Sequence, residues 1–188
     1  GEAEEKALLD VLHSGTWGRQ EGTQVATFEQ EFAAYQGAKY GVAVVNGSGA
    51  LWVGLMAAGI QEGDEVIVPP YTFQATAVSV IEANAVPVFV DIHPDSYCLD
   101  PDLIEDAITD RTRAIIPVHF AGQAADMDAI MAIARKYELV VIEDAAHAHG
   151  ATYHNQGLGA IGDMGAFSFQ SSKNLTSGEG GIVLTNSE

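Results

Sequence analysis

Short apolar runs alternate with longer stretches of helical periodicity along most of the chain. The runs with the length and composition of β-strands are Val42–Val45, Glu65–Val68, Val86–Val90, Arg113–Val118, Leu139–Ile142, Ala166–Phe169 and Ile182–Leu184. The stretches with helical periodicity are Gly49–Ala58, Gln74–Ala83, Pro101–Ala107 and Met127–Tyr137. This alternation predicts βαβ units, and therefore an α/β fold with three layers, α/β/α, around a mostly parallel sheet.

Local signals mark two of the predicted helix starts. Asp100 precedes a proline that would occupy the first helical position, and Asp126 can cap the helix that follows it. No repeat, low-complexity tract or linker interrupts the pattern, and 188 residues suffice for one sizeable core but not for two. We therefore expect a single domain over residues 1–188.

The charge of the chain restricts its partners. Eight basic and 26 acidic residues give a net charge of −18, so nucleic acid and anionic membranes are poor partners. An anionic ligand would depend on helix N-termini and one or two well-placed cations. The apolar runs are also much shorter than the ~20 residues of a membrane-spanning helix, so we expect no contact with a membrane.

Cellular location follows only from indirect signals. The single cysteine, Cys98, allows no internal disulfide and fits a reducing compartment, and no secretory segment is visible. These features indicate a cytoplasmic protein. The chain starts at Gly1 within an amphipathic pattern that includes Leu8 and Leu12, so we expect that an upstream segment precedes it.

Residues with chemical potential follow several of the predicted strands. Ligands of open α/β sheets bind at the carboxyl ends of the strands, so these positions are the ones to inspect. The segments concerned are Asn46–Gly49, Pro69–Phe73, His119–Phe120, Glu143–His147 and Ser168–Gly181. Together they predict a binding site at one edge of the sheet.

The segment Asn46-Gly47-Ser48-Gly49 joins a strand to a helix through small residues. Free backbone N–H groups and the helix dipole make such a turn a phosphate cradle. A dinucleotide-binding fingerprint would need a third glycine where Trp52 stands, which weakens a nicotinamide-binding hypothesis. The same segment is equally compatible with a tight turn that binds nothing.

The predicted strand Leu139–Ile142 runs into two acids, Glu143 and Asp144, of which strand alternation can direct only one into the site. A carboxylate there can keep a pyridine nitrogen protonated, although capping the next turn is the commoner role of such an aspartate. A metal site formed by His119, His147 and His149 is an alternative that no established ligand spacing supports, so we predict no bound metal.

Lys173 follows a predicted strand and lies in a small polar loop that ends in glycines. A lysine in such a loop is ordinarily a solvated surface residue. If a binding site encloses it near a carbonyl ligand, desolvation lowers its pKa and makes the amine a nucleophile. The sequence pattern alone leaves both interpretations open.

Ordered motifs along nearly the whole chain resemble the DegT/DnrJ/EryC1/StrS aminotransferases, which depend on pyridoxal 5′-phosphate (PLP) and adopt fold type I. They are Ser14–Trp17 with Phe28-Glu29, Asn46–Ser48, Pro70–Phe73, Pro117–Gly122, Glu143–Gly150, Phe167–Lys173 and Gly178–Gly181. The agreement of several motifs in one order is far more specific than any single motif. The chain thus looks like the large domain of such an enzyme.

The resemblance implies roles for individual residues. Lys173 would form the Schiff base with PLP, and Asp144 would pair with the pyridine nitrogen. Phe73 would stack on the ring, while His147 stands where many relatives have a glutamine that bonds the ring hydroxyl. Ser168, together with Gly47, Ser48 and Gly49, would hold the phosphate.

The resemblance also implies a reaction, in which an amino group moves from glutamate or glutamine to a keto-sugar or keto-cyclitol, such as those of antibiotic biosynthesis. A lysine at position 173 favours transamination over the sugar dehydration of relatives that carry histidine there. Other hypotheses remain: a PLP-dependent dehydratase or lyase, a nicotinamide-binding oxidoreductase and a non-catalytic remnant. Arg19 is a candidate contact for a nucleotide diphosphate, although a plain surface role is the simpler interpretation.

The resemblance further implies a homodimer whose active sites are shared between subunits. Such enzymes have roughly twice this length, with a smaller C-terminal domain. We therefore expect a partial chain that lacks the N-terminal arm and the C-terminal small domain.

Overall fold

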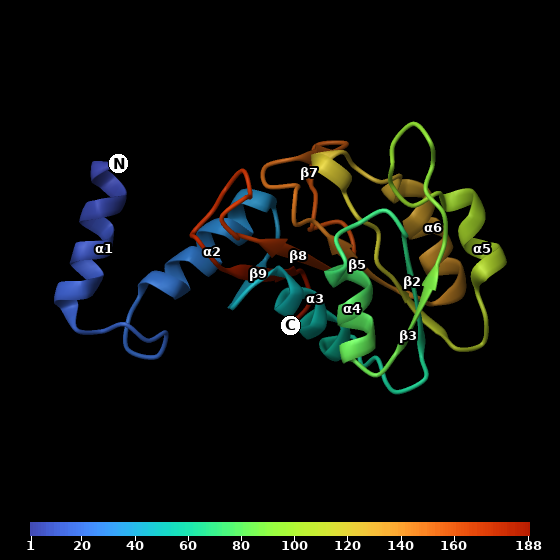
Figure 1. Cartoon of the computed structure of the whole chain (residues 1–188), viewed down its shortest axis with the longest axis horizontal. Helices are drawn as coiled ribbons and strands as arrows, with labels where there is room; N and C mark the ends of the chain where they lie inside the picture. The colour runs from blue at the N-terminus through green and yellow to red at the C-terminus, as the bar shows by residue number, and fades with distance from the viewer.

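The computed structural model describes residues 1–188 (Figure 1). The strands are β1 (Tyr40–Val44), β2 (Glu65–Val68), β3 (Val86–Phe89), β4 (Thr112–Ile115), β5 (Val140–Asp144), β6 (Thr152–Tyr153), β7 (Gln156–Gly157), β8 (Met164–Ser168) and β9 (Gly181–Thr185). The α-helices are α1 (Glu2–Ser14), α2 (Gln24–Gln36), α3 (Gly47–Ala57), α4 (Ala75–Glu82), α5 (Ile104–Ala107) and α6 (Met127–Tyr137). Two short 3₁₀ turns, η1 (Pro101–Leu103) and η2 (Phe120–Gly122), complete the structure.

A sheet of seven strands in the order β1-β9-β8-β5-β4-β2-β3 forms the centre of the molecule. Strands β8, β5, β4, β2 and β3 are parallel neighbours, whereas β9 pairs antiparallel with both β1 and β8. Strand β9 is thus the one strand that runs against the others. The small strands β6 and β7 form a separate hairpin.

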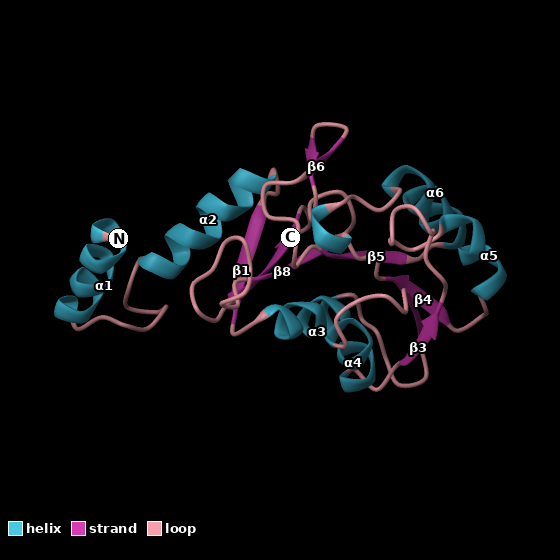
Figure 2. Cartoon of the chain, turned by 45° about the horizontal axis from the view of Figure 1, so that its top comes forward, coloured by secondary structure: helices cyan, strands magenta, loops and turns pink.

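Helices cover both faces of the sheet, which confirms the predicted three-layer α/β/α architecture. Figure 2 shows α3 and α4 on one side and α5 and α6 on the other. Helix α2 packs beside β1, where Phe32 and Ala33 join a buried cluster with Phe167 and Ile182. None of the helices combines the length and hydropathy that a membrane span requires.

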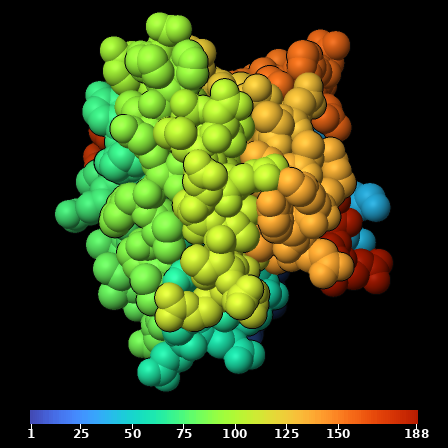
Figure 3. All heavy atoms as spheres, turned by 90° about the vertical axis from the view of Figure 1, so that its right-hand side faces the viewer, coloured from blue at the N-terminus to red at the C-terminus, as the bar shows by residue number.

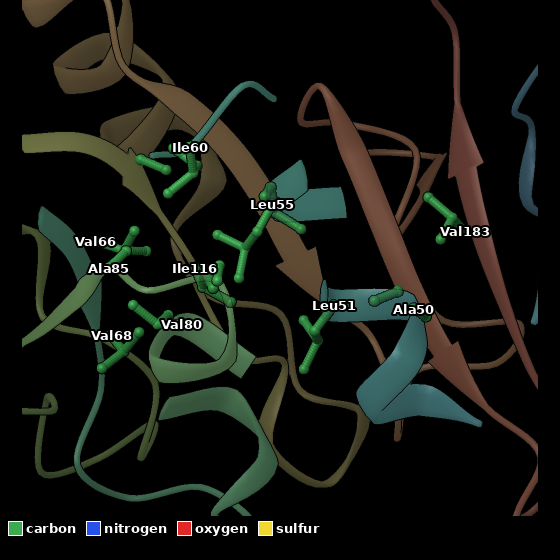
Figure 4. Close-up of a cluster of buried hydrophobic side chains, with 14 residues drawn as sticks. Ala50, Leu51, Leu55, Ile60, Val66, Val68, Val80, Ala85, Ile116 and Val183 are labelled. Atoms are coloured by element: carbon green, nitrogen blue, oxygen red, sulfur yellow. The ribbon is translucent and has the colours of Figure 1, made fainter. Parts of the chain in front are cut away.

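Branched aliphatic side chains fill the space between the sheet and its helices. Under α3 and α4, Leu55 packs with Val66 and Ile116, and all three are fully buried (Figure 4). Burial of such a side chain contributes roughly 1.5–3 kcal/mol. A second buried cluster includes Ile104 and Ile130, and the segments around residues 90–110 and 125–140 lie side by side at the end of the molecule shown in Figure 3.

Every predicted strand and helix is present, with ends displaced by no more than three residues, and the predicted helix Pro101–Ala107 consists of η1 followed by α5. The largest displacement is in β4, which ends at Ile115 rather than at Val118. Pro117 has no N–H group, so it cannot continue a ladder of backbone hydrogen bonds. Sequence periodicity did not predict helices α1 and α2 or the β6–β7 hairpin.

The carboxylate of Glu143, at the end of β5, is completely buried and fully hydrogen-bonded. Its Oε2 atom accepts hydrogen bonds from His119 Nε2 at 2.8 Å and from the backbone N–H of Gly159 at 2.7 Å. Its Oε1 atom accepts from the N–H groups of Ile161 and Gly162, each at 2.7 Å. The His119 ring is itself fixed, because its Nδ1 atom accepts from Ala125 N–H at 3.2 Å. One side chain therefore joins β5 to two loops.

We expect Glu143→Gln to lower the free energy of unfolding by about 3 kcal/mol, because the amide presents N–H groups to backbone donors and removes a buried charge from its partners. Urea denaturation measures this loss. The exposed Glu82→Gln is the control and should change stability by no more than about 0.5 kcal/mol. An unchanged transition for Glu143→Gln would show that this carboxylate does not hold the loops.

Candidate active site

A cavity of about 690 Å³ opens at the carboxyl ends of the parallel strands. Its walls come from the segments that follow β1, β2, β4, β5 and β8. The predicted site residues that line it are Gly47, Ser48, Phe73, Asp144, His147, Ser168 and Lys173. The fold thus brings together in one cavity side chains separated by more than a hundred residues of sequence.

The N-terminus of α3 forms one wall of the cavity. The Asn46 side chain caps the helix by accepting a hydrogen bond from Gly49 N–H at 2.7 Å. Of the predicted phosphate loop, Gly47 and Ser48 line the cavity, whereas Gly49 does not and its N–H is bonded to Asn46. The N–H groups of Gly47 and Ser48, in the first turn, have no intrahelical acceptor and remain suited to an anion.

Ser168 lies directly against the start of α3. A Cβ atom added to Gly47 would lie 2.7 Å from Ser168 Cβ, so only glycine permits this approach. Ser168 is 7% exposed and lines the cavity beside the two unpaired N–H groups of α3. A hydroxyl and a helix N-terminus, both suited to an anion, therefore lie side by side at the cavity wall, although the chain as a whole is strongly acidic.

Asp144 is 6% exposed and faces the cavity from the end of β5. Its Oδ2 atom accepts a hydrogen bond from Thr76 Oγ1 at 2.7 Å, and Oδ1 accepts from Ala146 N–H at 3.2 Å. The two hypotheses for this residue are compatible, because the same carboxylate caps the following turn and borders the cavity. Strand alternation directs Glu143 to the other side of β5, as predicted.

The His147 ring is held in one tautomer. Its Nδ1 atom accepts a hydrogen bond from Ala121 N–H at 3.3 Å, which leaves the proton on Nε2. Desolvation lowers the pKa of His147, and the neighbouring Lys173 charge lowers it further, against an opposing effect of Asp144. The ring is therefore a neutral hydrogen-bond donor beside the cavity. Ala121 adopts a left-handed conformation, with φ of 52°, to present its N–H group.

The three histidines do not form a metal-ligand set. The structure contains no group of three or more His, Cys, Asp or Glu side chains arranged to hold a metal ion. His119 is occupied by Glu143, and His149 Nε2 donates a hydrogen bond to the Ser168 carbonyl at 2.9 Å. Burial lowers the pKa of His149, whose ring packs against Phe167 and Phe169. His149 therefore supports the strand that carries Ser168.

Aromatic side chains line the mouth of the cavity. Phe73 is 68% exposed just before α4, so its ring can cover a planar ligand. Tyr71 and Phe120 also line the cavity, with ring centroids 4.6 Å apart. Sequence reasoning singled out Phe73 but did not predict the contact between Tyr71 and Phe120, because the two residues come from loops far apart in sequence.

Lys173 lies in a turn after β8, where its N–H donates to the Gln170 carbonyl at 2.9 Å. The side chain is half-buried and lines the cavity, which favours the interpretation of an enclosed lysine over that of a solvated surface lysine. It is the one cationic side chain of the lining, which also contains the acids Asp144 and Glu179. An amine and a carboxylate thus border the same cavity.

Arg19 lies outside the cavity and pairs with Glu29. Its Nη2 and Nε atoms donate to the two carboxylate oxygens of Glu29 at 2.8 and 3.2 Å, and Glu29 also accepts from Ala43 N–H at 2.9 Å. This pair lowers the pKa of Glu29. Glu29 therefore attaches α2 to β1, and Arg19 binds the segment before α2 to the same carboxylate, outside the cavity.

Known proteins are similar to this chain in sequence and in structure. The family model of the DegT/DnrJ/EryC1/StrS aminotransferases matches residues 1–188. The L-glutamine:2-deoxy-scyllo-inosose aminotransferase of Streptomyces lividus is 45% identical over 185 residues, which cover 96% of this chain and 44% of that protein.

Solved structures agree over the same region. An aminotransferase from Psychrobacter cryohalolentis matches with a TM-score of 0.97 and 45% identity, over 100% of this chain and 48% of that one. NtdA of Bacillus subtilis, solved with the bound cofactor PMP, matches with a TM-score of 0.90 and 38% identity, over 97% of this chain and 41% of that one. The chain spans about half the length of the curated relatives it matches. On this combination of sequence and structure, the chain belongs to the DegT/DnrJ/EryC1/StrS aminotransferase family.

Proposed function

We propose that residues 1–188 are the PLP-binding large domain of an aminotransferase that moves an amino group from glutamine or glutamate to a keto-sugar or keto-cyclitol. The observation that carries this proposal is the convergence of Lys173, Asp144 and the anion position at Ser168 on one cavity. Each of these features has a commoner structural explanation when considered alone. Their meeting in a single site of adequate volume supports a cofactor with a carbonyl, a ring nitrogen and a phosphate.

The residues present fit PLP. The unpaired N–H groups of Gly47 and Ser48 and the Ser168 hydroxyl suit the phosphate, and the glycine at 47 permits their close approach. His147 Nε2 is a donor suited to the ring hydroxyl, in the place of the glutamine of many relatives. When bound, PLP supplies an electron sink that stabilises negative charge at the donor carbon.

Asp144 and Lys173 have distinct tasks in the proposed reaction. Asp144 would hold the pyridine nitrogen in its protonated form, which is the form that makes the ring an electron sink. Lys173 would supply the amine that attaches the cofactor covalently, with loss of water, and, when free, the base that takes a proton from the donor α-carbon. Desolvation lowers the pKa of Lys173, while the Asp144 charge opposes that change. The lowered pKa favours the neutral amine that both tasks require.

The acceptor class is supported by the names of relatives. Two similar proteins are aminotransferases that use L-glutamine and 2-deoxy-scyllo-inosose, from Streptomyces lividus and Streptomyces paromomycinus. A ring ketone of this type carries no charge, which suits a lining whose one cation is Lys173. We therefore favour a neutral cyclic ketone over a nucleotide-linked sugar as the acceptor.

We propose a second copy of the chain as a further partner. Helix α1 buries none of its residues and lies apart from the sheet in Figure 1. Leu8 is 73% exposed on it, and Trp17 beyond its end is 70% exposed. Apolar groups this exposed are suited to an interface between subunits. Sedimentation that finds only monomers at micromolar concentration would contradict this part of the proposal.

We expect Lys173→Ala to abolish covalent attachment of PLP. The purified wild-type chain mixed with PLP should gain a visible absorbance band, and borohydride should fix the cofactor on Lys173, as mass spectrometry of peptides can show. Lys136→Ala, which removes an exposed lysine, should behave as wild type. A reducible band that persists in Lys173→Ala would exclude this lysine as the attachment site.

The pH dependence of Lys173 provides a second test. Because its pKa is lowered, its amine should react at a lower pH than that of Lys136, whose pKa the Glu105 carboxylate raises. Acetylation across a pH series, quantified for each lysine by mass spectrometry, gives both midpoints in the cofactor-free chain. Asp144→Asn should lower the Lys173 midpoint further, since it removes a charge that stabilises the ammonium form. Equal midpoints for the two lysines would contradict the proposed desolvation.

A further inference from the structure

A chain of two hydroxyl groups leads from the wall of the cavity to Asp144. Thr76 Oγ1 donates a hydrogen bond to Asp144 Oδ2 at 2.7 Å, across 68 residues of sequence. Because the Thr76 proton is used in this bond, its oxygen must accept the bond from Thr72 Oγ1, which lies 2.8 Å away. The three groups therefore form a directed relay, Thr72 to Thr76 to Asp144.

Thr76 bonds to another element of the fold. It is the second residue of α4, so the residue four positions earlier, Thr72, precedes the helix, and the Thr76 hydroxyl reaches the carboxylate at the end of β5. The residue is completely buried, so its hydroxyl cannot exchange this partner for water.

The relay connects two parts of the candidate site. Thr72 lines the cavity and immediately precedes Phe73, the ring proposed to cover the cofactor. Thr76 does not line the cavity but holds one carboxylate oxygen of Asp144, while Ala146 N–H holds the other. With one bond to each oxygen, the plane of the carboxylate is fixed. Its remaining acceptor capacity is left for the cavity.

We propose that Thr76 and Thr72 are positioning residues that orient the Asp144 carboxylate toward the pyridine nitrogen and join it to the loop that carries Phe73. This inference rests on the proposed function, because it assumes that PLP occupies the cavity. Neither threonine needs to touch the reacting atoms. Thr76 acts through Asp144. Thr72 acts through Thr76 and also holds the loop that carries Phe73 in a fixed position relative to the Asp144 carboxylate.

Valine and serine substitutions separate the relay from packing. Thr76→Val keeps the shape of the buried side chain and removes the hydroxyl, whereas Thr76→Ser keeps the hydroxyl and removes a methyl group. Thr72→Val breaks only the outer bond, between the two threonines. None of these changes alters Asp144, Lys173 or the anion position.

Two measurements on the full chain test the inference. We expect Thr76→Val to weaken PLP affinity about tenfold, the effect of losing one hydrogen bond to a charged group, and Thr76→Ser to remain within about twofold of wild type. Thr72→Val should weaken affinity about threefold, because a neutral pair contributes less. The NMR chemical shift of the pyridine nitrogen in isotope-labelled PLP should move toward its unprotonated value in Thr76→Val and return in Thr76→Ser.

The outcomes distinguish the relay from simple packing. If Thr76→Val lowers only the thermal midpoint and leaves PLP affinity and the nitrogen shift as in wild type, the positioning role is wrong while the proposed function stands. If wild type itself binds no PLP, the proposed function fails and the inference fails with it. If Thr76→Val does not fold, Thr72→Val decides the question, and wild-type affinity and nitrogen shift in that variant would overturn the relay.

Discussion

The buried carboxylate of Glu143 fixes the edge of the sheet on which the candidate site is built. It joins the end of β5 to the His119 loop and to the segment that contains Gly159 and Gly162. A buried charge is tolerable only when donors surround it, and here each oxygen receives two hydrogen bonds. Since neighbouring residues of a strand face opposite sides, holding Glu143 in place directs Asp144 into the cavity. Two adjacent carboxylates thus have different tasks: Glu143 holds the loops to the sheet, and Asp144 faces the cavity.

In this acidic molecule, individual N–H and hydroxyl groups take the place of a positively charged surface as candidate anion ligands. With a net charge of −18, the surface does not attract a phosphate. The anion position depends on free N–H groups at α3 and on the Ser168 hydroxyl, which the missing side chain of Gly47 brings together. The one cation of the lining is Lys173, and the proposed chemistry uses its amine rather than its charge. Oriented N–H and hydroxyl groups therefore replace the basic patch that binds phosphate in other proteins.

The sequence predicted the fold and most of the cavity because both follow from local patterns. Alternating strand and helix periods place Asp144, Ser168 and Lys173 at strand ends, where parallel strands bring them together. The reversed direction of β9 is not encoded in its own apolar residues. Helix α2 could have been predicted from the sequence, since Phe28 and Phe32 recur at helical spacing and Gly37 ends the helix in a left-handed conformation.

Other features depend on contacts between distant segments. Nothing in Ala75-Thr76-Ala77 indicates that the Thr76 hydroxyl donates to Asp144, and nothing near Arg19 indicates its pairing with Glu29.

The central claim is that this cavity holds PLP between Lys173, Asp144 and the start of α3. A crystal structure of the chain reduced with borohydride in the presence of PLP tests it most directly. The account predicts the phosphate at Gly47, Ser48 and Ser168, the ring nitrogen at Asp144 and a covalent bond to Lys173. A cofactor attached to another lysine, or a phosphate bound elsewhere, would contradict it.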